Sequence, residues 1–439
     1  MLSCERLNPL DVESHGGVRA TARHLRSLAP TADSVTEVVR DIIAAVRTGG
    51  DAALRAHTMR LDTAGTDPGT LLVPDETLER SLDALEPGVR AALEQAIANV
   101  MTVCQAQVSE DHDVVLAQGQ VVRLREVPVQ RAAVYVPGGR APYPSTVVMG
   151  VVAARAAGVI DVVVCAPPGP DGEVNPLILG ASRLCGAAGV YRMGGAQAIA
   201  ALAYGTESVP AVDVIVGPGN LYVQEAKRQV SGVVGIDGFA GPSDLLVIAG
   251  PDAPAHLVAL DLLAQAEHGP ESLVVAVSRD APWLDQLADW VERYSEHRPT
   301  ATPAACVLVQ TADAHDAFDL ADEFAPEHLQ LVGAEAEALA PRVRRAGCVL
   351  VGWPSGTAFG DYIAGSNHVL PTGGAARFGS ALGPRHFRRR MSEVHVGGAA
   401  AALAVAALPL AQAEGFPVHA ESMRARAPVP EEESDGSQG

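Results

Sequence analysis

The sequence has few aromatic residues and little positive charge. Phe, Trp and Tyr make up 4% of its 439 residues, which argues against a surface built to stack on bases or sugars. The formal net charge of −20 opposes binding to nucleic acid or to an anionic membrane through bulk electrostatics. Both shortages are ordinary for a soluble protein, and neither identifies a partner.

Paired cysteines, a secretion signal and membrane-spanning runs are missing as well. The six cysteines are scattered without a CxxC pair, so they predict neither a zinc ribbon nor a disulfide framework. The N-terminal MLSCERLNPL has no basic start followed by an apolar core. No uninterrupted apolar run reaches membrane-spanning length. We therefore expect a reduced, cytoplasmic location.

Small and branched apolar residues are abundant. Hydrophobic residues make up 48% of the sequence, enough for large buried cores. Because 439 residues exceed the usual size of one domain, we expect two or more. Residues 1–127 predict a mainly helical N-terminal region, since their apolar residues recur at helical spacing, as from Val35 to Val46.

From Pro128 onward, short Val-rich runs alternate with Ala-rich helical stretches. The runs lie at 132–137, 159–167, 189–193, 212–217, 245–250, 273–278, 306–311, 329–332 and 348–352. Apolar runs bounded by Gly and Pro and separated by helices indicate βαβ units around a parallel sheet. We predict an α/β fold of two Rossmann-like lobes, at 128–236 and 237–384. An internal duplication would explain them, although no residue-level repeat proves one.

Sheet signals fade beyond Gly383. Residues 385–426 are too few for a core of their own, so we expect this C-terminal segment to pack on another lobe or on another subunit. Residues 427–439 form an acidic tail that is predicted to be disordered.

Three Gly-rich turns follow strands of the first predicted lobe, at 136–140, 193–198 and 217–220. Glycine lets the backbone approach a ligand closely, and helix N-termini offer free N–H groups to phosphate. None of the turns is a GxGxxG fingerprint, so a nucleotide site and three plain turns remain equal alternatives. The polar candidates at these turns are Tyr135, Gln197 and Asn220.

The second predicted lobe contains the most distinctive chemistry. The stretch DLLAQAEHGPES (261–272) predicts a helix end with Gln265 and His268 on one face, where the negative end of the helix dipole favours a cation. Glu327 and His328 are adjacent at a helix-to-strand break and could serve as two proton-transfer groups. The simpler alternatives are a polar surface patch and a solvated Glu beside a structural His.

Further polar residues could complete a metal shell. Zinc accepts a mixed set of nitrogen and oxygen donors, and the candidate donors are Gln265, His268, Asp361 and His419. They are far apart in the sequence, and neither an HExxH motif nor a cysteine ligand set is present. Spacing alone therefore does not establish a metal site.

Eight strings together resemble the histidinol dehydrogenase family. They are VYVPGG (134–139), MGGAQAIAAL (193–202), VGPGN with EAKRQV (216–230), AGPSD (240–244), DLLAQAEHGP (261–270), FAPEHL (324–329), GDYIAGSNHVLPTGG (360–374) and AEGFPVHAES (413–422). The resemblance runs from about residue 5 to residue 426 in the family's order. One string would be weak support, but eight in order are highly specific.

The resemblance implies an NAD-dependent enzyme with one zinc ion per subunit. It implies a two-step oxidation of L-histidinol via L-histidinaldehyde to L-histidine, the final step of L-histidine biosynthesis. Members are usually homodimers with an intertwined C-terminal segment, so residues 385–426 are expected to be exchanged in a dimer.

The resemblance also assigns roles to residues. The expected zinc ligands are Gln265, His268, Asp361 and His419, the last reaching into the partner's site. The expected proton-transfer pair is Glu327 and His328. The expected NAD positions are Tyr135, Gln197 and Asn220. The expected substrate positions are Ser243, Gln265, His268, His328, Asp361, Glu414 and His419.

Chemistry supports this assignment and leaves two competitors. Histidinol carries an imidazole and an amine, so a zinc ion could orient it and act as a Lewis acid. We expect His328 to remove the alcohol proton and Glu327 to activate water for attack on the aldehyde, since no cysteine stands in these motifs. A zinc hydrolase would leave the three Gly-rich turns without a role. A binding module for imidazole compounds or nucleotides would not need an intact Glu327–His328 pair.

Overall fold

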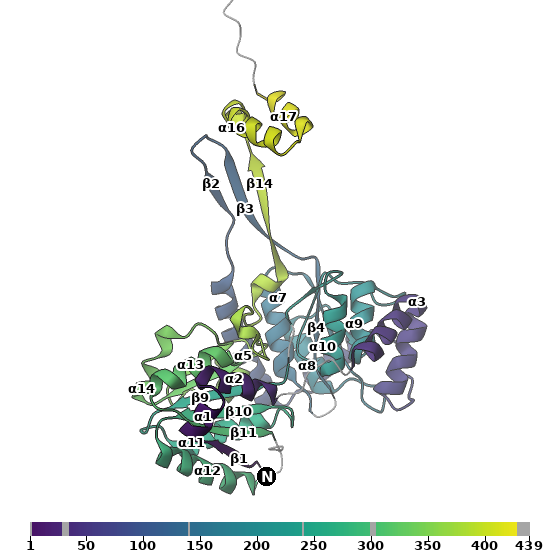
Figure 1. The fold of residues 1–439 in the computed structure, drawn as a ribbon. Helices are drawn as coiled ribbons and strands as arrows, with labels where there is room; N and C mark the ends of the chain where they lie inside the picture. Colours follow the sequence, from purple (N-terminus) through teal and green to yellow (C-terminus); the bar gives the residue numbers. More distant parts are fainter. Residues whose placement is uncertain (1, 29–34, 139–140, 239–240, 299–303, 428–439) are drawn as a thin grey trace, which may run out of the picture. The chain divides into compact units, whose positions relative to one another are not determined.

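The computed structural model describes residues 2–28, 35–138, 141–238, 241–298 and 304–427 (Figure 1). The chain divides into two compact units, each with its own fold. The first is Met1–Val108 with Val129–Phe387, and the second is Ser109–Pro128 with Arg388–Gly439. The predicted disorder of residues 427–439 falls outside the described residues, except for Ala427, and so do Gly139, Arg140 and Ala240 of the quoted strings.

The first unit contains a five-stranded parallel sheet in the order β6-β5-β4-β7-β8. Its strands are β4 (Arg131–Tyr135), β5 (Asp161–Ala166), β6 (Gly189–Arg192), β7 (Val214–Val216) and β8 (Gly235–Ile236). The first four Val-rich runs of the sequence form β4 to β7. They are continuous rather than alternating because helices bury both faces of the sheet.

The helices of this lobe form two layers. One layer consists of α4 (Asp75–Asp83), α5 (Pro87–Gln107), α6 (Pro144–Val147), the π-helical turn η2 (Val148–Val152), α7 (Ala153–Ala156) and α8 (Pro176–Cys185). The other consists of α3 (Thr36–Leu61), α9 (Gly195–Tyr204) and α10 (Leu221–Val230). Gly150 in η2 allows close packing on the sheet, because a Cβ there would lie 2.4 Å from Val134.

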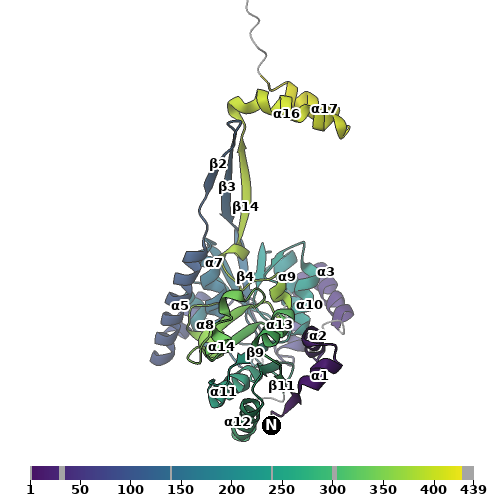
Figure 2. The ribbon, with the colours of Figure 1, turned by 60° about the vertical axis from the view of Figure 1, so that its left-hand side comes forward.

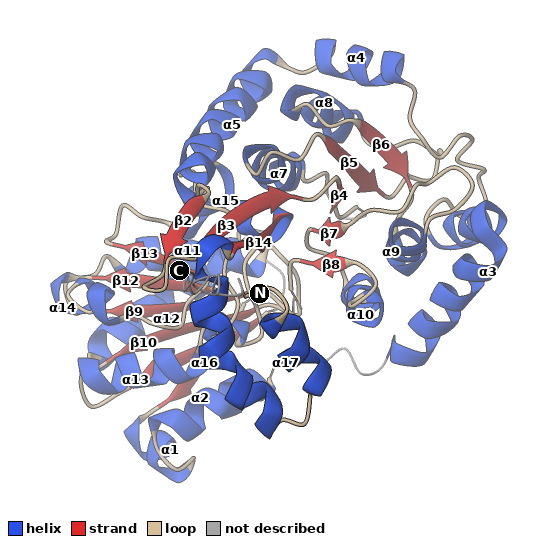
Figure 3. Ribbon diagram, turned by 90° about the horizontal axis from the view of Figure 1, so that it is seen from above, coloured by secondary structure: helices blue, strands red, loops and turns tan. Residues whose placement is uncertain are grey.

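The second lobe of this unit contains a six-stranded parallel sheet in the order β1-β11-β10-β9-β12-β13 (Figure 3). Its strands are β1 (Cys4–Leu7), β9 (Asp244–Ala249), β10 (Leu273–Ser278), β11 (Ala305–Gln310), β12 (His328–Val332) and β13 (Cys348–Val351). One face is covered by α11 (Ala255–Ala266) and α12 (Ala281–Ser295). The other is covered by α1 (Pro9–Ser14), α2 (Val18–Ser27), α13 (Ala314–Phe324) and α14 (Ala334–Glu337).

The two sheets share one topology. Counted from β4 in the first lobe and from β9 in the second, both run 3-2-1-4-5, and β1 is added at the outer edge of β11. This agrees with the predicted pair of Rossmann-like lobes. In such sheets, a ligand typically binds at the carboxyl ends of the strands where the order reverses.

Besides the two-residue strand β8, four strands were not predicted from the sequence. Within residues 1–127, the described part contains β1, β2 (His112–Val115) and most of β3 (Val121–Pro128), in addition to helices α1 to α5. The expectation that sheet signals fade beyond Gly383 was wrong, because β14 (Arg388–His395) follows it. Except for β1, these strands have a charged face, so they lack the continuous apolar runs of a buried sheet.

The second unit is a three-stranded antiparallel sheet followed by two helices (Figure 2). The sheet order is β14-β3-β2, and the helices are α16 (Ala400–Ala413) and α17 (Pro417–Arg424). On one face, Arg123 is in register with Asp113 and Glu393. On the other face, Val122 is in register with Val114 and Val394, which are 39% and 60% exposed. The sheet therefore has a charged face and an open apolar face.

A membrane-spanning helix is not found among the described residues, since none of their helices is both long and apolar enough.

Candidate active site

The three candidate NAD residues lie at the carboxyl ends of the first sheet. Tyr135 is the last residue of β4, Gln197 lies in the first turn of α9 after β6, and Asn220 is the N-cap of α10 after β7. The strand order reverses at β4, which lies between β5 and β7. These residues therefore surround the position where this fold class binds nucleotides.

Tyr135 and Gln197 are both tied to the backbone or side chains around α9. The Tyr135 hydroxyl accepts a hydrogen bond from Gly195 N at 3.1 Å. Gly195 has φ +63°, and a Cβ there would lie 2.7 Å from Gln197 Oε1. Gln197 Nε2 donates to Asp62 Oδ2 at 3.1 Å, whereas the buried Oε1 has no hydrogen-bond partner among the described residues. Burial raises the pKa of Asp62 to about 6.

The turn at 217–220 is braced by a buried ion pair. Gly217 has φ +115°, and a Cβ there would lie 2.1 Å from the Tyr135 carbonyl oxygen. Its N–H donates to Asp237 at 2.7 Å, and its carbonyl accepts from Lys227 Nζ at 3.0 Å. Lys227 and Asp237 also pair directly, and both side chains are buried. The turn therefore keeps one shape close against the end of β4.

The candidate catalytic residues lie instead at the amino ends of the second sheet. Ser243 immediately precedes β9, and Glu327 immediately precedes β12, which begins at His328. Gln265 Nε2 donates to Ser243 Oγ at 2.6 Å, and Ser243 Oγ donates to Glu327 Oε2 at 2.5 Å. One hydrogen-bonded chain thus joins three of the residues singled out in the sequence.

A sharp turn in the backbone between α13 and β12 positions Glu327. Helix α13 ends at Phe324, and Ala325 then adopts the left-handed conformation at φ +51° before Pro326. Burial and the neighbouring Asp244 carboxylate raise the pKa of Glu327 well above its usual range. The hydrogen bonds that Glu327 accepts from Ser243 and from the Asp244 N–H lower this pKa, but they offset only part of the increase. A carboxylate in such surroundings is a stronger base when it is ionised.

His328 lies beside Asp361. Its Nε2 is 3.7 Å from Asp361 Oδ1, and its buried Nδ1 has no hydrogen-bond partner among the described residues. Burial, with the nearby His268, lowers the pKa of His328 to about 3. The imidazole is therefore neutral at physiological pH and has a lone pair that can accept a proton.

The position of His268 corrects one sequence-based expectation. Helix α11 ends at Ala266, so Gln265 is in its last turn and His268 lies in the turn beyond it. The two residues were predicted to share a helix face. They are instead linked through the backbone, where His268 N donates to Gln265 O at 3.2 Å.

Asp361 lies on α15 (Thr357–Tyr362), which is fastened at both ends. Asp261 of α11 accepts hydrogen bonds from the Thr357 N–H and from Gln330 Nε2, the latter at 2.7 Å. His368 Nδ1 donates to the Asp361 carbonyl oxygen at 2.8 Å, while its Nε2 lies 3.3 Å from Thr146 Oγ1. Asp261 thereby connects the helix bearing Gln265 to the helix bearing Asp361.

The candidate ligands in the first unit suit a cation. No three His, Cys, Asp or Glu side chains in the described ranges form a metal-binding group by themselves. However, Gln265 Oε1 is buried without a hydrogen-bond partner in these ranges, and burial alone raises the pKa of Asp361 to about 7. A buried carbonyl oxygen and a partly buried carboxylate in this condition fit a zinc ion as donors.

Glu414 and His419 belong to the second unit. Glu414 is the C-cap of α16, and His419 lies in α17 with its ring centroid 5.2 Å from that of Phe416. Both side chains are exposed. The structure therefore brings together Ser243, Gln265, Glu327, His328 and Asp361 in the first unit, whereas Glu414 and His419 belong to the fold of the second unit.

Sequence reasoning missed several supporting groups. Asp244 braces Glu327, Asp62 holds Gln197, and Lys227 with Asp237 holds the 217–220 turn. A charged residue at the first position of an otherwise apolar strand could have revealed Asp244, since buried charges need partners. Nothing in the sequence near Asp62 distinguishes it from a surface carboxylate.

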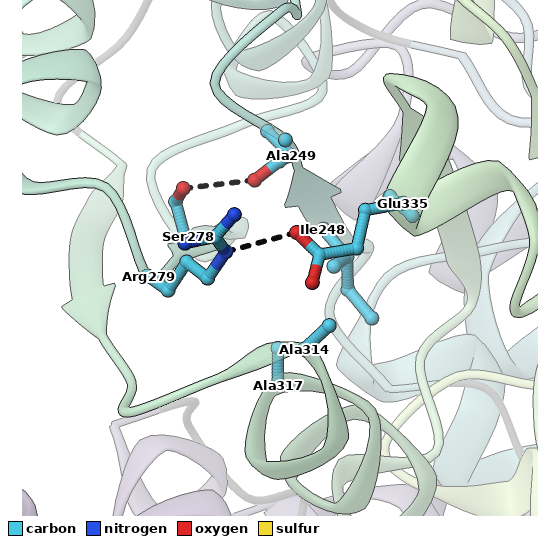
Figure 4. Close-up of a pocket in the computed structure, with 9 residues that line it drawn as sticks. Ile248, Ala249, Ser278, Arg279, Ala314, Ala317 and Glu335 are labelled. Atoms are coloured by element: carbon cyan, nitrogen blue, oxygen red, sulfur yellow. Dashed lines mark hydrogen bonds and ion pairs between the residues drawn. The ribbon is translucent and has the colours of Figure 1, made fainter.

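Figure 4 shows side chains at the carboxyl edge of the second sheet. A small pocket there is lined by residues that include Ile248, Ala249, Ser278, Arg279, Ala314, Ala317 and Glu335. Arg279 Nε donates to Glu335 at 2.9 Å, and Ser278 Oγ donates to the Ala249 carbonyl at 2.8 Å. These polar groups of the pocket are therefore hydrogen-bonded, whereas Gln197 Oε1 in the first lobe has no partner among the described residues.

Comparisons with known proteins agree over almost the full chain. The family model described as histidinol dehydrogenase matches residues 26–427. A histidinol dehydrogenase of Pseudomonas syringae pv. syringae (strain B728a) is 43% identical over 425 residues, covering 93% of this chain and 94% of that protein. One of Parasynechococcus marenigrum (strain WH8102) is 47% identical over 392 residues, covering 88% and 89%. The crystal structure of histidinol dehydrogenase from Elizabethkingia anophelis matches with a TM-score of 0.88 at 28% identity, covering 97% and 98%.

Proposed function

The chain belongs to the histidinol dehydrogenase family, and from this membership and the site geometry we propose how its residues carry out the reaction. It is an NAD-dependent, zinc-containing oxidoreductase that converts L-histidinol through L-histidinaldehyde to L-histidine, the final step of L-histidine biosynthesis. Its six free thiols support our proposal that it works in the reducing cytoplasm.

The proposed zinc ligands are Gln265, His268, Asp361 and, from a second subunit, His419. Support comes from the buried Gln265 Oε1 without a partner among the described residues and from the partly buried Asp361 carboxylate. A bound zinc ion supplies a Lewis acid and a template for the imidazole and amine of the substrate. The proposed substrate-binding residues are Ser243, Gln265, His268, His328, Asp361, Glu414 and His419.

Proton transfer is divided between two neighbours. The neutral His328 imidazole accepts the alcohol proton while a hydride leaves to NAD. Glu327 then takes a proton from the water that adds to the aldehyde, and bound NAD would supply the hydride acceptor for each oxidation. The observation that carries this proposal is the hydrogen-bonded chain from Gln265 through Ser243 to Glu327, which joins a candidate metal ligand to the candidate base.

A cysteine adduct is the other usual route for aldehyde oxidation. Cys348 is in register with His328 on the neighbouring strand. Burial and the Asp361 carboxylate raise the pKa of the Cys348 thiol, so it stays protonated and poorly nucleophilic. We therefore propose direct hydration of the aldehyde.

NAD is proposed to bind at Tyr135, Gln197 and Asn220, where the helix N-termini of α9 and α10 would offer N–H groups to its phosphates. Asn220 Oδ1 caps α10 by accepting from the N–H groups of Tyr222 and Val223, each at 3.1 Å. The unpartnered Gln197 Oε1 leaves an acceptor for the cofactor. NAD supplies the hydride acceptor for both oxidations.

Counting NADH formed per L-histidinol in Glu327→Gln tests the division of roles. The unchanged protein should form two NADH. Glu327→Gln should form about one and accumulate L-histidinaldehyde, because loss of a general base slows its step about 10²- to 10⁴-fold. Cys348→Ala should still form two. Two NADH at an unchanged rate from Glu327→Gln would contradict the role of Glu327, and no NADH from metal-loaded unchanged protein would favour a hydrolase.

We also propose a homodimer in which His419 acts across the interface. The open apolar face around Val122 and the exposure of Glu414 and His419 support it. His419→Asn and Glu327→Gln subunits should each be deficient in forming L-histidine. Mixing them should restore about a quarter of the full rate of L-histidine formation, since half of the dimers are mixed and one of their two sites is intact. No restoration despite proven subunit exchange would contradict a shared site.

A further inference from the structure

We propose that Arg26 is a positioning residue that holds Glu327 for oxidation of the aldehyde. This inference rests on the proposed role of Glu327. Arg26 lies in the last turn of α2, almost 300 residues before the site, and its side chain is 17% exposed. No motif or resemblance singled it out.

The Arg26 guanidinium forms hydrogen bonds with the turn that precedes Glu327. Nε and Nη2 donate to the Phe324 carbonyl at 2.9 and 2.8 Å, and Nη2 also donates to the Ala325 carbonyl at 2.9 Å. Its Cζ lies 3.6 Å from the centroid of the Phe324 ring. A cation at these carbonyls complements the negative end of α13 and stabilises the left-handed Ala325.

Arg26 also reaches Glu327 from a second side, through Asp244. Nη1 donates to Asp244 Oδ2 at 2.5 Å, and the Asp244 side chain is 1% exposed. Asp244 Oδ1 accepts from Glu327 N at 2.8 Å, while Glu327 Oε2 accepts from Asp244 N at 2.9 Å. These two reciprocal hydrogen bonds fix both the backbone and the carboxylate of Glu327. Arg26 in turn holds the Asp244 carboxylate that takes part in them.

Positive charge and planar geometry together make the contact specific to arginine. Asp244 and Glu327 are two buried carboxyl groups side by side, and Arg26 is the cation hydrogen-bonded to Asp244. Lysine would keep the charge, but its single ammonium group cannot reproduce the planar fork that reaches three acceptor groups. Methionine would remove both the charge and the hydrogen bonds while keeping an apolar stem near Phe324.

The test is a double-mutant cycle between Arg26 and Glu327 in the full-length, zinc-loaded protein. Arg26→Met should slow oxidation of added L-histidinaldehyde by about tenfold or more, with Arg26→Lys between it and the unchanged protein, and zinc content unchanged. Oxidation of L-histidinol to the aldehyde should change less than about threefold. Because Arg26 acts through Glu327, Arg26→Met should add less than about twofold in a Glu327→Gln background.

Arg23→Met is the matched control. Arg23 lies on the same helix and makes an exposed ion pair with Glu323 at 2.9 Å, so it contributes to the α2–α13 contact without reaching Asp244. It should leave both oxidations within about twofold. If Arg26→Met does not fold, Arg26→Lys provides the same comparison.

Three outcomes separate the possibilities. Equal slowing of both oxidations by Arg26 variants, or a full multiplication of effects in the Glu327→Gln background, would overturn the positioning role and leave the proposed function standing. Unchanged aldehyde oxidation in Glu327→Gln alone would overturn the proposed role of Glu327, and the inference about Arg26 with it.

Discussion

The Asp62 side chain affects both the stability of the protein and the position of a residue proposed to bind NAD. It is the C-cap of α3, and its carboxylate accepts a hydrogen bond from Gln197, a proposed NAD residue. Burial raises its pKa from 3.8 to about 6. The folded protein therefore holds the carboxylate in surroundings that disfavour its charge, which suits a group placed for binding rather than for stability.

This pKa predicts a pH-dependent effect of Asp62→Asn. Between about pH 4 and 6 the folded state binds more protons at Asp62 than the unfolded state, so its contribution to the free energy of unfolding falls as pH rises through that window. Asp62→Asn should therefore stabilise the protein at pH 7.5, by about 1–3 kcal/mol, and have little effect near pH 4. Urea unfolding at both pH values measures the difference.

Asp41→Asn provides the control for this prediction. Asp41 lies on the same helix with a side chain that is 81% exposed. Its replacement should change the free energy of unfolding by less than about 0.5 kcal/mol at either pH. A loss of stability in Asp62→Asn that is equal at both pH values would show that the hydrogen bond to Gln197 outweighs the burial of charge.

Helices α11 and α15 each contribute proposed zinc ligands, and Asp261 joins them. Its carboxylate receives the first N–H of α15 and the Gln330 amide. Groups that orient metal ligands in this way typically change metal affinity when they are removed. The relative position of Gln265 and Asp361 therefore depends on a residue that is not itself expected to touch the metal.

Asp261→Ala should weaken zinc binding by about 10- to 100-fold, measured by competition with a chromogenic chelator. Asp289→Ala, an exposed position on the neighbouring helix α12, should leave zinc affinity unchanged. Unchanged zinc affinity in Asp261→Ala, in a protein that is folded, would mean that α15 keeps its place without Asp261, for example through the His368 contact with the Asp361 carbonyl.

The second unit decides the proposed assembly of the whole protein. Its sheet exposes Val114 and Val394 on one face, whereas the opposite face carries the Arg123–Asp113 ion pair at 2.7 Å. If the apolar face meets a second copy, Val394→Glu should convert dimers to monomers in sedimentation experiments and lower activity with it. Val115→Glu, at a 71% exposed position on the charged face, should leave the dimer intact. A dimeric, active Val394→Glu protein would exclude this face as the interface.

The sequence predicts nine of the eleven strands of the two parallel sheets because burial on both faces leaves continuous apolar runs, as at 161–166 and 273–278. It does not predict β2, β3 and β14, since Arg123 and Glu393 on their charged face interrupt such runs. Glu327 and His328 are recognisable because they are adjacent in one string. Arg26 is not, because tertiary packing alone brings it to the Phe324–Glu327 turn from about 300 residues away.

The pairing of β1 with β11 has a consequence for synthesis. Cys4 is in register with Cys306, and Arg26 contacts the Phe324 carbonyl 298 residues later, so residues 2–28 belong to the second lobe. A ribosome adds about 5–20 residues per second, which puts the partners of this segment about 15–60 s behind it. The first lobe can fold before the partners of the N-terminal segment have been synthesised. Arg26 can contact the turn before Glu327 only after most of the polypeptide has emerged.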